Sequence, residues 1–227
     1  MNLIEHYNNL YKASILKIQS DCYQIDERID STADNRLGIT LIIRPNIQVI
    51  NNIQTFLDDL KAIEPNQYYY PNSDIHVTAL SLISCYNGFD IAQISILEYV
   101  ELIKKSITAY NKSFEIEFRG ITASPSCIMV QGFLSDNTLN DIRDNLRLNF
   151  KNSNLQQTID NRYAIQTAHT TVVRFRKELT KKDAFITVLD TYRDYNFGTS
   201  TINTLELVYN DWYQRKEFVK ELSRFNI

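Results

Sequence analysis

The sequence predicts a mixed α/β chain in which two halves with similar ingredients each contain a sheet flanked by helices. Segments with helical spacing of apolar residues alternate with short apolar runs typical of strands, and the order of these segments is similar in the two halves. No linker rich in Gly, Ser or Pro divides the halves. With 227 residues, of which 44% are hydrophobic, the chain can bury a sizeable core. We therefore expect two lobes that pack as one unit.

The first half begins with an amphipathic segment in which Tyr7, Tyr11 and Ile18 recur at helical spacing. Pro45 ends the first strand, and the polar side chain of Asp90 is typical of a helix N-cap. In chain order we expect a helix at 2–20, a strand at 37–44, a helix at 47–62, a strand at 75–83 and a helix that Asp90 caps and that includes Ile107.

The second half contains a strictly alternating segment, a strand-forming run after the turn at Ser124-Pro125, and two further amphipathic segments. The residues Thr180-Lys181-Lys182-Asp183 have the pattern of a capping box at a helix start. We expect strands at 114–118 and 127–133, a helix at 139–150, a strand at 166–175, a helix from 180 and a last strand at 200–209.

Composition excludes several classes of protein. The formal net charge of −3 argues against a protein that coats long nucleic acid, because such binding needs many basic side chains. The three cysteines form no C-x-x-C pair, and the sequence has neither a G-x-G-x-x-G nor a P-loop pattern among its five glycines. No apolar run approaches the roughly 20 residues of a membrane span, and the first seven residues lack the features of a secretory signal. We therefore expect a cytoplasmic protein.

Two of the three histidines occur in matching contexts, His76-Val77-Thr78-Ala79 and His169-Thr170-Thr171-Val172. Both have the pattern H-x-T-x. Because side chains alternate across a strand, each motif would place an imidazole and a hydroxyl on one face. Taken alone, either motif is also explained by a core histidine with a hydrogen-bond partner beside a threonine, which strands favour. The pair of motifs, both in apolar strands, favours a functional site.

Further side chains are candidates for binding a substrate. Arg174 follows the second motif, although a regular strand would turn it to the face opposite His169, so a bulge or strand end would be needed to redirect it. The aromatic groups Tyr68-Tyr69-Tyr70 and Trp212-Tyr213 are candidates to stack on a base, with ordinary packing as the alternative.

With these motifs, the sequence resembles the 2H phosphoesterase superfamily over residues 37–210. The run His169 to Arg174 fits the family's longer second motif, H-x-T-hydrophobic-x-R, whereas Ala79 replaces the bulkier apolar residue that commonly follows the first threonine. The resemblance implies a bilobal, pseudo-symmetric fold of two mainly antiparallel sheets, flanked by helices, around a central cleft. It implies a domain at 37–227, preceded by a helical extension at 1–36.

The residue types suit phosphodiester chemistry, since in-line cleavage needs one group that accepts a proton and another that donates one. Two histidines can do this near neutral pH without a metal or other cofactor. The resemblance implies that His76 and His169 act as general acid and base and that Thr78 and Thr171 hold the phosphate. Arg174, Tyr70 and Tyr69 are the expected substrate-binding residues.

The reaction we expect is hydrolysis of a 2',3'-cyclic phosphodiester to a 2'-phosphate. The partner would be a nucleotide or a short RNA, with neither duplex DNA nor a membrane, and the protein would act as a monomer. Hydrolysis of 2'-5'-linked oligonucleotides or other cyclic nucleotides is an alternative activity. A non-catalytic module that binds a phosphorylated ligand, or a structural protein with accidental motifs, is an alternative of a different class.

Overall fold

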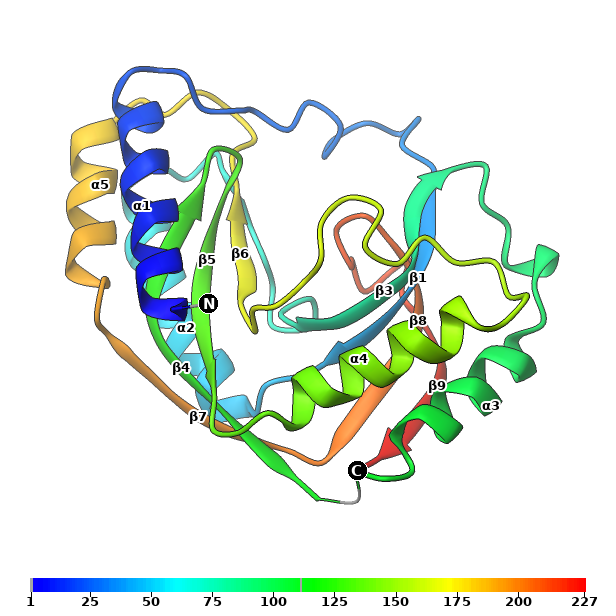
Figure 1. The fold of residues 1–227 in the computed structure, drawn as a ribbon. Coiled ribbons are helices and arrows are strands. Elements are labelled where there is room, and N and C mark those ends of the chain that lie inside the picture. Colours follow the sequence, from blue (N-terminus) through cyan, green and yellow to red (C-terminus); the bar gives the residue numbers. More distant parts are fainter. Residues whose placement is uncertain (1, 111) are drawn as a thin grey trace.

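The computed structural model describes residues 2–110 and 112–227, in which two antiparallel sheets lie side by side with helices on their outer faces (Figure 1). In the order of their pairing, the first sheet contains β3 (Val77–Asn87), β1 (Arg36–Ile43), β8 (Thr204–Asp211) and β9 (Lys220–Asn226). The second contains β2 (Tyr68–Tyr69), β6 (Thr170–Arg174), β5 (Cys127–Leu134), β4 (Phe114–Ser124) and β7 (Asn196–Ile202). The prediction of a mixed fold with two mainly antiparallel sheets is confirmed.

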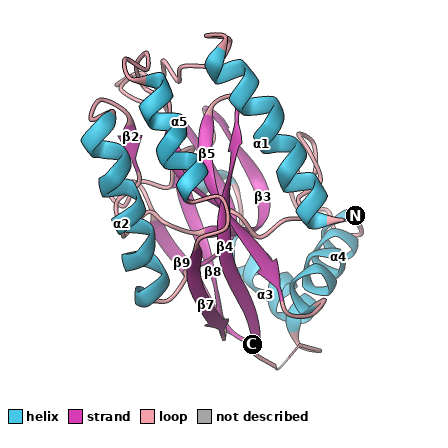
Figure 2. Cartoon of the chain, turned by 90° about the vertical axis from the view of Figure 1, so that its left-hand side faces the viewer, coloured by secondary structure: helices cyan, strands magenta, loops and turns pink. Residues whose placement is uncertain are grey.

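The helices are divided between the two sheets. Three of them, α1 (Leu3–Gln19), α2 (Ile47–Ile63) and α5 (Lys182–Thr191), pack against the second sheet and against one another (Figures 1 and 2). The other two, α3 (Ile96–Ile107) and α4 (Thr138–Lys151), pack together beside the first sheet. None of the helices in 2–110 and 112–227 is long and apolar enough to cross a membrane.

The two sequence halves do not each form their own lobe, which corrects the prediction. Strand β1 is buried along most of its length and has a neighbour on each side, β3 from its own half and β8 from the carboxyl-terminal half. Helix α2 follows β1 in the chain but packs on β7 and β6 of the other sheet. Apolar spacing shows that a face is buried but not which segment covers it. The pairing of β1 with β8 and the packing of α2 on the other sheet could therefore not be predicted.

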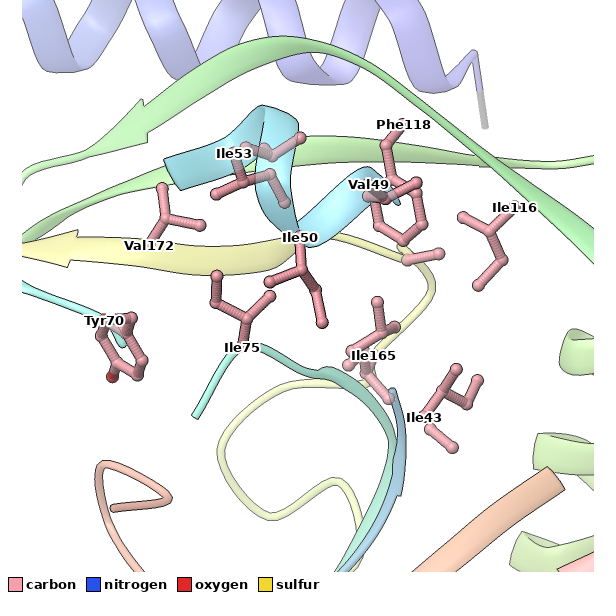
Figure 3. Packing of buried hydrophobic residues seen from close by; sticks show 14 of the residues in the cluster. Ile43, Val49, Ile50, Ile53, Tyr70, Ile75, Ile116, Phe118, Ile165 and Val172 are labelled. Carbon is pink, nitrogen blue, oxygen red and sulfur yellow. The ribbon is translucent and has the colours of Figure 1, made fainter. Parts of the chain in front are cut away.

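Apolar side chains from α2 and from both sheets meet in one core. Ile50 and Ile53 of α2 point toward Ile75 and Val172, and all four side chains are buried (Figure 3). Burying an aliphatic side chain of this size stabilises the fold by roughly 1.5–3 kcal/mol. Because Ile75 precedes His76 and Val172 is the last residue of the second motif, this core fixes the backbone of both motifs.

Several predicted boundaries were wrong, since β3 and β4 continue past the predicted ends at 83 and 118 and β6 begins at Thr170 and not at 166. Asp90 caps the short helix η1 (Ile91–Gln93) through the backbone N–H of Ala92, and α3 begins later, at Ile96. The predicted last strand at 200–209 is two strands, because the chain passes from one sheet to the other at Asn203, and β9 was not predicted. The predicted capping box at Thr180 is absent: the buried carboxylate of Glu64 accepts from the backbone N–H of Lys181 instead.

Helix α1 is attached to β4 by buried polar contacts as well as by apolar packing. The Ser14 hydroxyl donates to the Ala123 carbonyl at 2.9 Å, and the Thr122 hydroxyl donates to the Tyr7 carbonyl at 2.9 Å. The Tyr7 hydroxyl in turn donates to the Gly132 carbonyl of β5 at 3.3 Å. This helix therefore supports the back of the second sheet, close to the segment that leads to His169.

Candidate active site

Both H-x-T-x motifs contribute to the wall of one cavity of about 180 Å³, to which both sheets supply residues. Each histidine lies one residue before its strand, β3 for His76 and β6 for His169. Six of the seven predicted site residues line the cavity, and they are His76, Thr78, His169, Thr171, Arg174 and Tyr70. The two motifs, distant in sequence, therefore come together with both hydroxyls and a guanidinium.

The first motif ends in a β-bulge. On β1, Leu41 and Ile42 pair with Leu80 and Thr78, which leaves Ala79 without an opposite residue. His76 and Thr78 are partly exposed to the cavity, while Val77 and Ala79 are buried on the other side. The alternation of the strand thus places the imidazole and the hydroxyl on one face, as the spacing predicted.

The second motif has a bulge at the matching position. On β5, Ile128 and Met129 pair with Val173 and Thr171, which leaves Val172 as the extra residue. The extra residue shifts the alternation by one, so that Arg174 lines the same cavity as His169 and Thr171. A regular strand would have turned this guanidinium away from the site.

A glycine on β5 lets the chain before His169 lie close to the sheet. A Cβ atom at Gly132 would collide with the backbone carbonyl of Ala168. The segment that carries His169 can therefore pack against β5 only where the neighbouring residue has no side chain.

The two imidazole rings are each oriented through Nδ1. Nδ1 of His76 lies 2.7 Å from the carbonyl oxygen of Asp74, which can only accept, so this nitrogen carries the proton. In the neutral ring Nε2 then has a free lone pair, as a general base requires. Nδ1 of His169 lies 2.7 Å from the Thr167 hydroxyl, which can donate or accept and so allows either tautomer.

Both histidines are held in the neutral form. Burial lowers the pKa of His76 to about 4, the bond to Asp74 opposes this, and the positive charges of Arg44, His169 and Arg174 add to it. Burial likewise lowers the pKa of His169 to about 4, with the charges of Arg143 and His6 adding to the effect. A buried imidazole beside cations resists protonation until an anion enters the cavity.

We expect the stability of the protein to fall as the pH is lowered from about 6.5 to about 4. In this range the unfolded chain binds protons on His76 and His169 that the folded chain does not bind. Between pH 7 and pH 5 each histidine should lower the free energy of unfolding by about 1 to 2 kcal/mol.

Urea unfolding of the wild type, His76→Asn and His169→Asn at the two pH values measures this. In each cavity variant, the decrease in the free energy of unfolding should be smaller by the contribution of the replaced histidine. His6→Asn, which lies outside the cavity, is the control for loss of an imidazole. An unchanged decrease in both cavity variants would contradict the assignment.

Arg143 of α4 is a residue that the sequence reasoning missed. Its guanidinium is fully buried and donates to the carbonyls of Ala79 at 2.7 Å, Thr78 at 3.0 Å and Thr167 at 2.8 Å. Two of these carbonyls belong to the bulge of the first motif, and the third belongs to the residue that holds His169. One side chain therefore ties the two motifs together. A helical arginine in an otherwise amphipathic segment carries no sequence signal that marks it as buried.

Arg174 and Tyr70 form a second polar group in the wall of the cavity, beside the second motif. Nε of Arg174 donates to the Tyr70 hydroxyl at 2.9 Å, and Nη1 lies 3.9 Å from a carboxylate oxygen of Asp26. Asp26 also accepts from the Tyr213 hydroxyl at 2.9 Å, which places Tyr213 in the support of this arginine. These contacts hold the guanidinium in a fixed direction, as binding of an anion requires.

The structure does not bring Tyr69 to the cavity. Its hydroxyl donates to the Glu64 carbonyl at 2.7 Å, and its ring lies under the ammonium of Lys61. Successive side chains of a strand point to opposite faces, so Tyr69 and Tyr70 cannot share one. Tyr70 therefore lines the cavity, whereas Tyr69 contacts Glu64 and Lys61 outside it.

The rest of the cavity wall has a different chemical character. Ser81, Ser84, Arg162 and Trp212 line it, and the Arg162 guanidinium lies 4.3 Å from the centroid of the Trp212 ring. The Cys85 thiol also lines the cavity, and burial raises its pKa to about 12, so it is not a thiolate nucleophile near neutral pH. Within 2–110 and 112–227, no three His, Cys, Asp or Glu side chains gather where they could hold a metal ion.

Comparison with solved structures shows relatives of this fold. The protein TT0787 of Thermus thermophilus superposes with a TM-score of 0.60 at 12% identity, over 83% of this chain and 97% of that one. E. coli LigT complexed with 3'-AMP superposes with a TM-score of 0.57 at 11% identity, over 85% of this chain and 99% of that one. Comparison with curated proteins gives no match.

The family model described as the AKAP7 2'5' RNA ligase-like domain matches residues 36–223, from the start of β1 into β9. The matched region contains both H-x-T-x motifs, and the superposed structures share the arrangement of the two sheets. Membership of this family supports an enzyme that acts on phosphodiester bonds. The chain therefore belongs to the AKAP7 2'5' RNA ligase-like domain family, within the 2H phosphoesterase superfamily.

Proposed function

We propose that the protein hydrolyses 2',3'-cyclic phosphodiesters of nucleotides or RNA ends to 2'-phosphates without a metal ion. The observation that carries this proposal is the shared cavity of the two motifs, in which His76 presents an unprotonated Nε2 while two hydroxyls and Arg174 surround the space for a phosphate. The resemblance of the fold to phosphoesterases supports it.

The proposed reaction is a single in-line displacement. Nε2 of His76 takes a proton from water as the water oxygen bonds to phosphorus, and the bond from phosphorus to O3' breaks. Protonated His169 gives its Nε2 proton to O3', which leaves as a hydroxyl, and the phosphate stays on O2'. Proton exchange with solvent then returns His76 to the neutral form, and His169 takes up its proton again when the next anionic phosphate enters the cavity.

Three side chains would stabilise the charge that develops on the phosphate. The hydroxyls of Thr78 and Thr171 donate to the two non-bridging oxygens, one from each sheet, and Arg174 supplies a positive charge. Loss of one preorganised donor of this kind typically costs about 2.7–4 kcal/mol of barrier. Arg143 holds the backbone of both motifs and does not itself line the cavity.

Turnover measured with a chelator present tests the proposal. The four nucleoside 2',3'-cyclic monophosphates and a short RNA with a terminal cyclic phosphate are offered to the protein, and the product is identified by phosphorus NMR. We expect 2'-phosphates. No turnover of any of these compounds would contradict the proposal, and products that carry only a 3'-phosphate would contradict the assigned leaving group.

A second candidate is hydrolysis of 2'-5'-linked oligonucleotides, which the description of the matched family favours. Turnover of such oligonucleotides, with cyclic phosphates left intact, would support it. Tight binding of nucleotides with no product would instead support a module that binds a phosphorylated ligand.

A further inference from the structure

The wall of the cavity contains two buried amide oxygens that have no hydrogen-bond partner. Asn210 and Gln214 both line the cavity, and each is only 2–4% exposed. Among the residues that the structure describes, Oδ1 of Asn210 and Oε1 of Gln214 have no hydrogen-bond partner. Burying an acceptor without a donor costs free energy of folding, so the two oxygens indicate a site where a ligand can supply the donors.

The orientation of the Asn210 amide follows from its neighbours. Its Nδ2 donates to the Asp211 carbonyl at 2.8 Å and lies 3.5 Å from the Cys85 sulfur. The donor side of the amide is therefore occupied, and the acceptor side is the one left over. Exchanging the two ends of the amide would lose these contacts and would place two carbonyl oxygens together.

Gln214 is held in an unusual backbone conformation. Its φ is +60°, in the left-handed region that non-glycine residues rarely adopt. Asp211 closes the turn, with its carbonyl accepting from the N–H of Gln214 and its carboxylate accepting from the N–H of Arg215 at 2.9 Å. Such strain persists where the surroundings enforce it, and it is concentrated at functional sites.

An aromatic ring lies between these two residues in the chain. Trp212 lines the same cavity, with the guanidinium groups of Arg162 and Arg36 at 4.3 and 4.9 Å from its ring centroid. A ring of this kind can stack on a heterocycle, and the exposed Arg162, which donates to the Cys85 carbonyl at 3.2 Å, would have to leave the ring for this. An aromatic surface next to two acceptors matches a planar ligand that carries N–H donors at its edge.

We propose that Asn210 and Gln214 form a base-binding subsite that selects nucleobases with an exocyclic amino group, adenine and cytosine, over hypoxanthine and uracil. This deepens the proposed function, because the phosphate of the same nucleotide would lie between the two histidines. The two oxygens are shielded from solvent in the free protein, so binding includes a movement of the Asn210–Gln214 segment that turns both oxygens toward the ligand, while Nδ2 of Asn210 keeps its bond to the Asp211 carbonyl of the same segment. An amino group supplies two donors, whereas a base with a carbonyl at that place would face acceptors with an acceptor.

Matched ligand pairs test the subsite without turnover. Binding of AMP against IMP, and of CMP against UMP, is measured by calorimetry, because in each pair a carbonyl replaces the amino group and the neighbouring ring nitrogen becomes an N–H. We expect the amino-bearing nucleotide of each pair to bind about tenfold more tightly or better. Equal affinity within both pairs, or no binding of any of the four, would overturn the subsite.

Gln214→Met assigns the preference to this residue, because methionine keeps the length of the side chain and removes the acceptor. The ratio within each pair should fall toward one, with UMP affinity little changed, while Gln93→Met, an exposed change outside the cavity, should keep the wild-type ratio. A folded Gln214→Met protein that retains the full ratio would count against the subsite. Parallel turnover of 2',3'-cyclic AMP separates the two proposals: a preserved ratio without turnover refutes only the hydrolysis, and turnover with a ratio of one refutes only the subsite.

Discussion

Replacing His169 or His76 with asparagine is expected to lower kcat/KM for 2',3'-cyclic AMP by about 10²–10⁴-fold while the fold is retained. Each imidazole transfers one proton in the proposed displacement, and an asparagine amide can transfer none. Asparagine keeps a donor close to the position of Nδ1, so the contact of His76 with the Asp74 carbonyl can be preserved. Steady-state kinetics with a chelator present, beside circular dichroism, measures the two effects separately.

The pH dependence of the same kinetics reports the assigned protonation states. One histidine must carry a proton and the other must not, and the pKa of each is lowered to about 4 in the free protein. We therefore expect kcat/KM to rise as the pH is lowered from 8 to 5, in the range where the singly protonated pair becomes more populated. Gln93→Met, the exposed change outside the cavity, should keep both the rate and the profile. Full activity of either cavity variant would refute the two-histidine mechanism.

The sequence identified the side chains of the two motifs that meet in the cavity because their signal is local. An imidazole and a hydroxyl two residues apart on a strand share a face whatever the rest of the fold does. The dependence of Arg174 on a bulge could also be stated in advance, since parity alone showed that a regular strand would misplace it. The bulge itself depends on the pairing of β6 with β5, and no residue of the motif predicts it.

What the sequence could not supply were contacts between distant segments. Apolar spacing predicted α2 but not its position on the opposite sheet. No sequence feature at Asn203 predicted that the chain crosses there from β7 in one sheet to β8 in the other. Asn210 lies on a strand and Gln214 in a turn, and no sequence pattern marks either residue. Only the structure shows that their amide oxygens have no hydrogen-bond partner and that both residues line the cavity. Local chemistry was therefore predictable, whereas the support of the site depended on tertiary structure.

Arg143→Met is expected to lower the free energy of unfolding by about 3–5 kcal/mol and kcat/KM by about 10²-fold. Methionine replaces the aliphatic part of the arginine side chain, but it removes the guanidinium and leaves the carbonyls of Ala79, Thr78 and Thr167 without their donor. Urea unfolding measures the first effect and kinetics on the folded protein measures the second. Arg119→Met, which removes a half-exposed arginine with a 3.6 Å contact to Glu117, should cost at most about 1 kcal/mol.

The pKa of His169 distinguishes a positioning role of Arg143 from a purely structural one. The charge of Arg143 contributes to the lowered pKa of that histidine, so its removal should raise the pKa of His169 and shift the pH profile of kcat/KM toward neutral pH. Arg143→Lys keeps the charge but cannot reach three carbonyls at once, so it should restore the pH profile more fully than the rate. If Arg143→Met were unstable yet kept the wild-type rate and pH profile when folded, the arginine would serve stability alone. Because its three bonds join the bulge of one motif to the residue that orients the histidine of the other, we expect stability and catalysis to fall together.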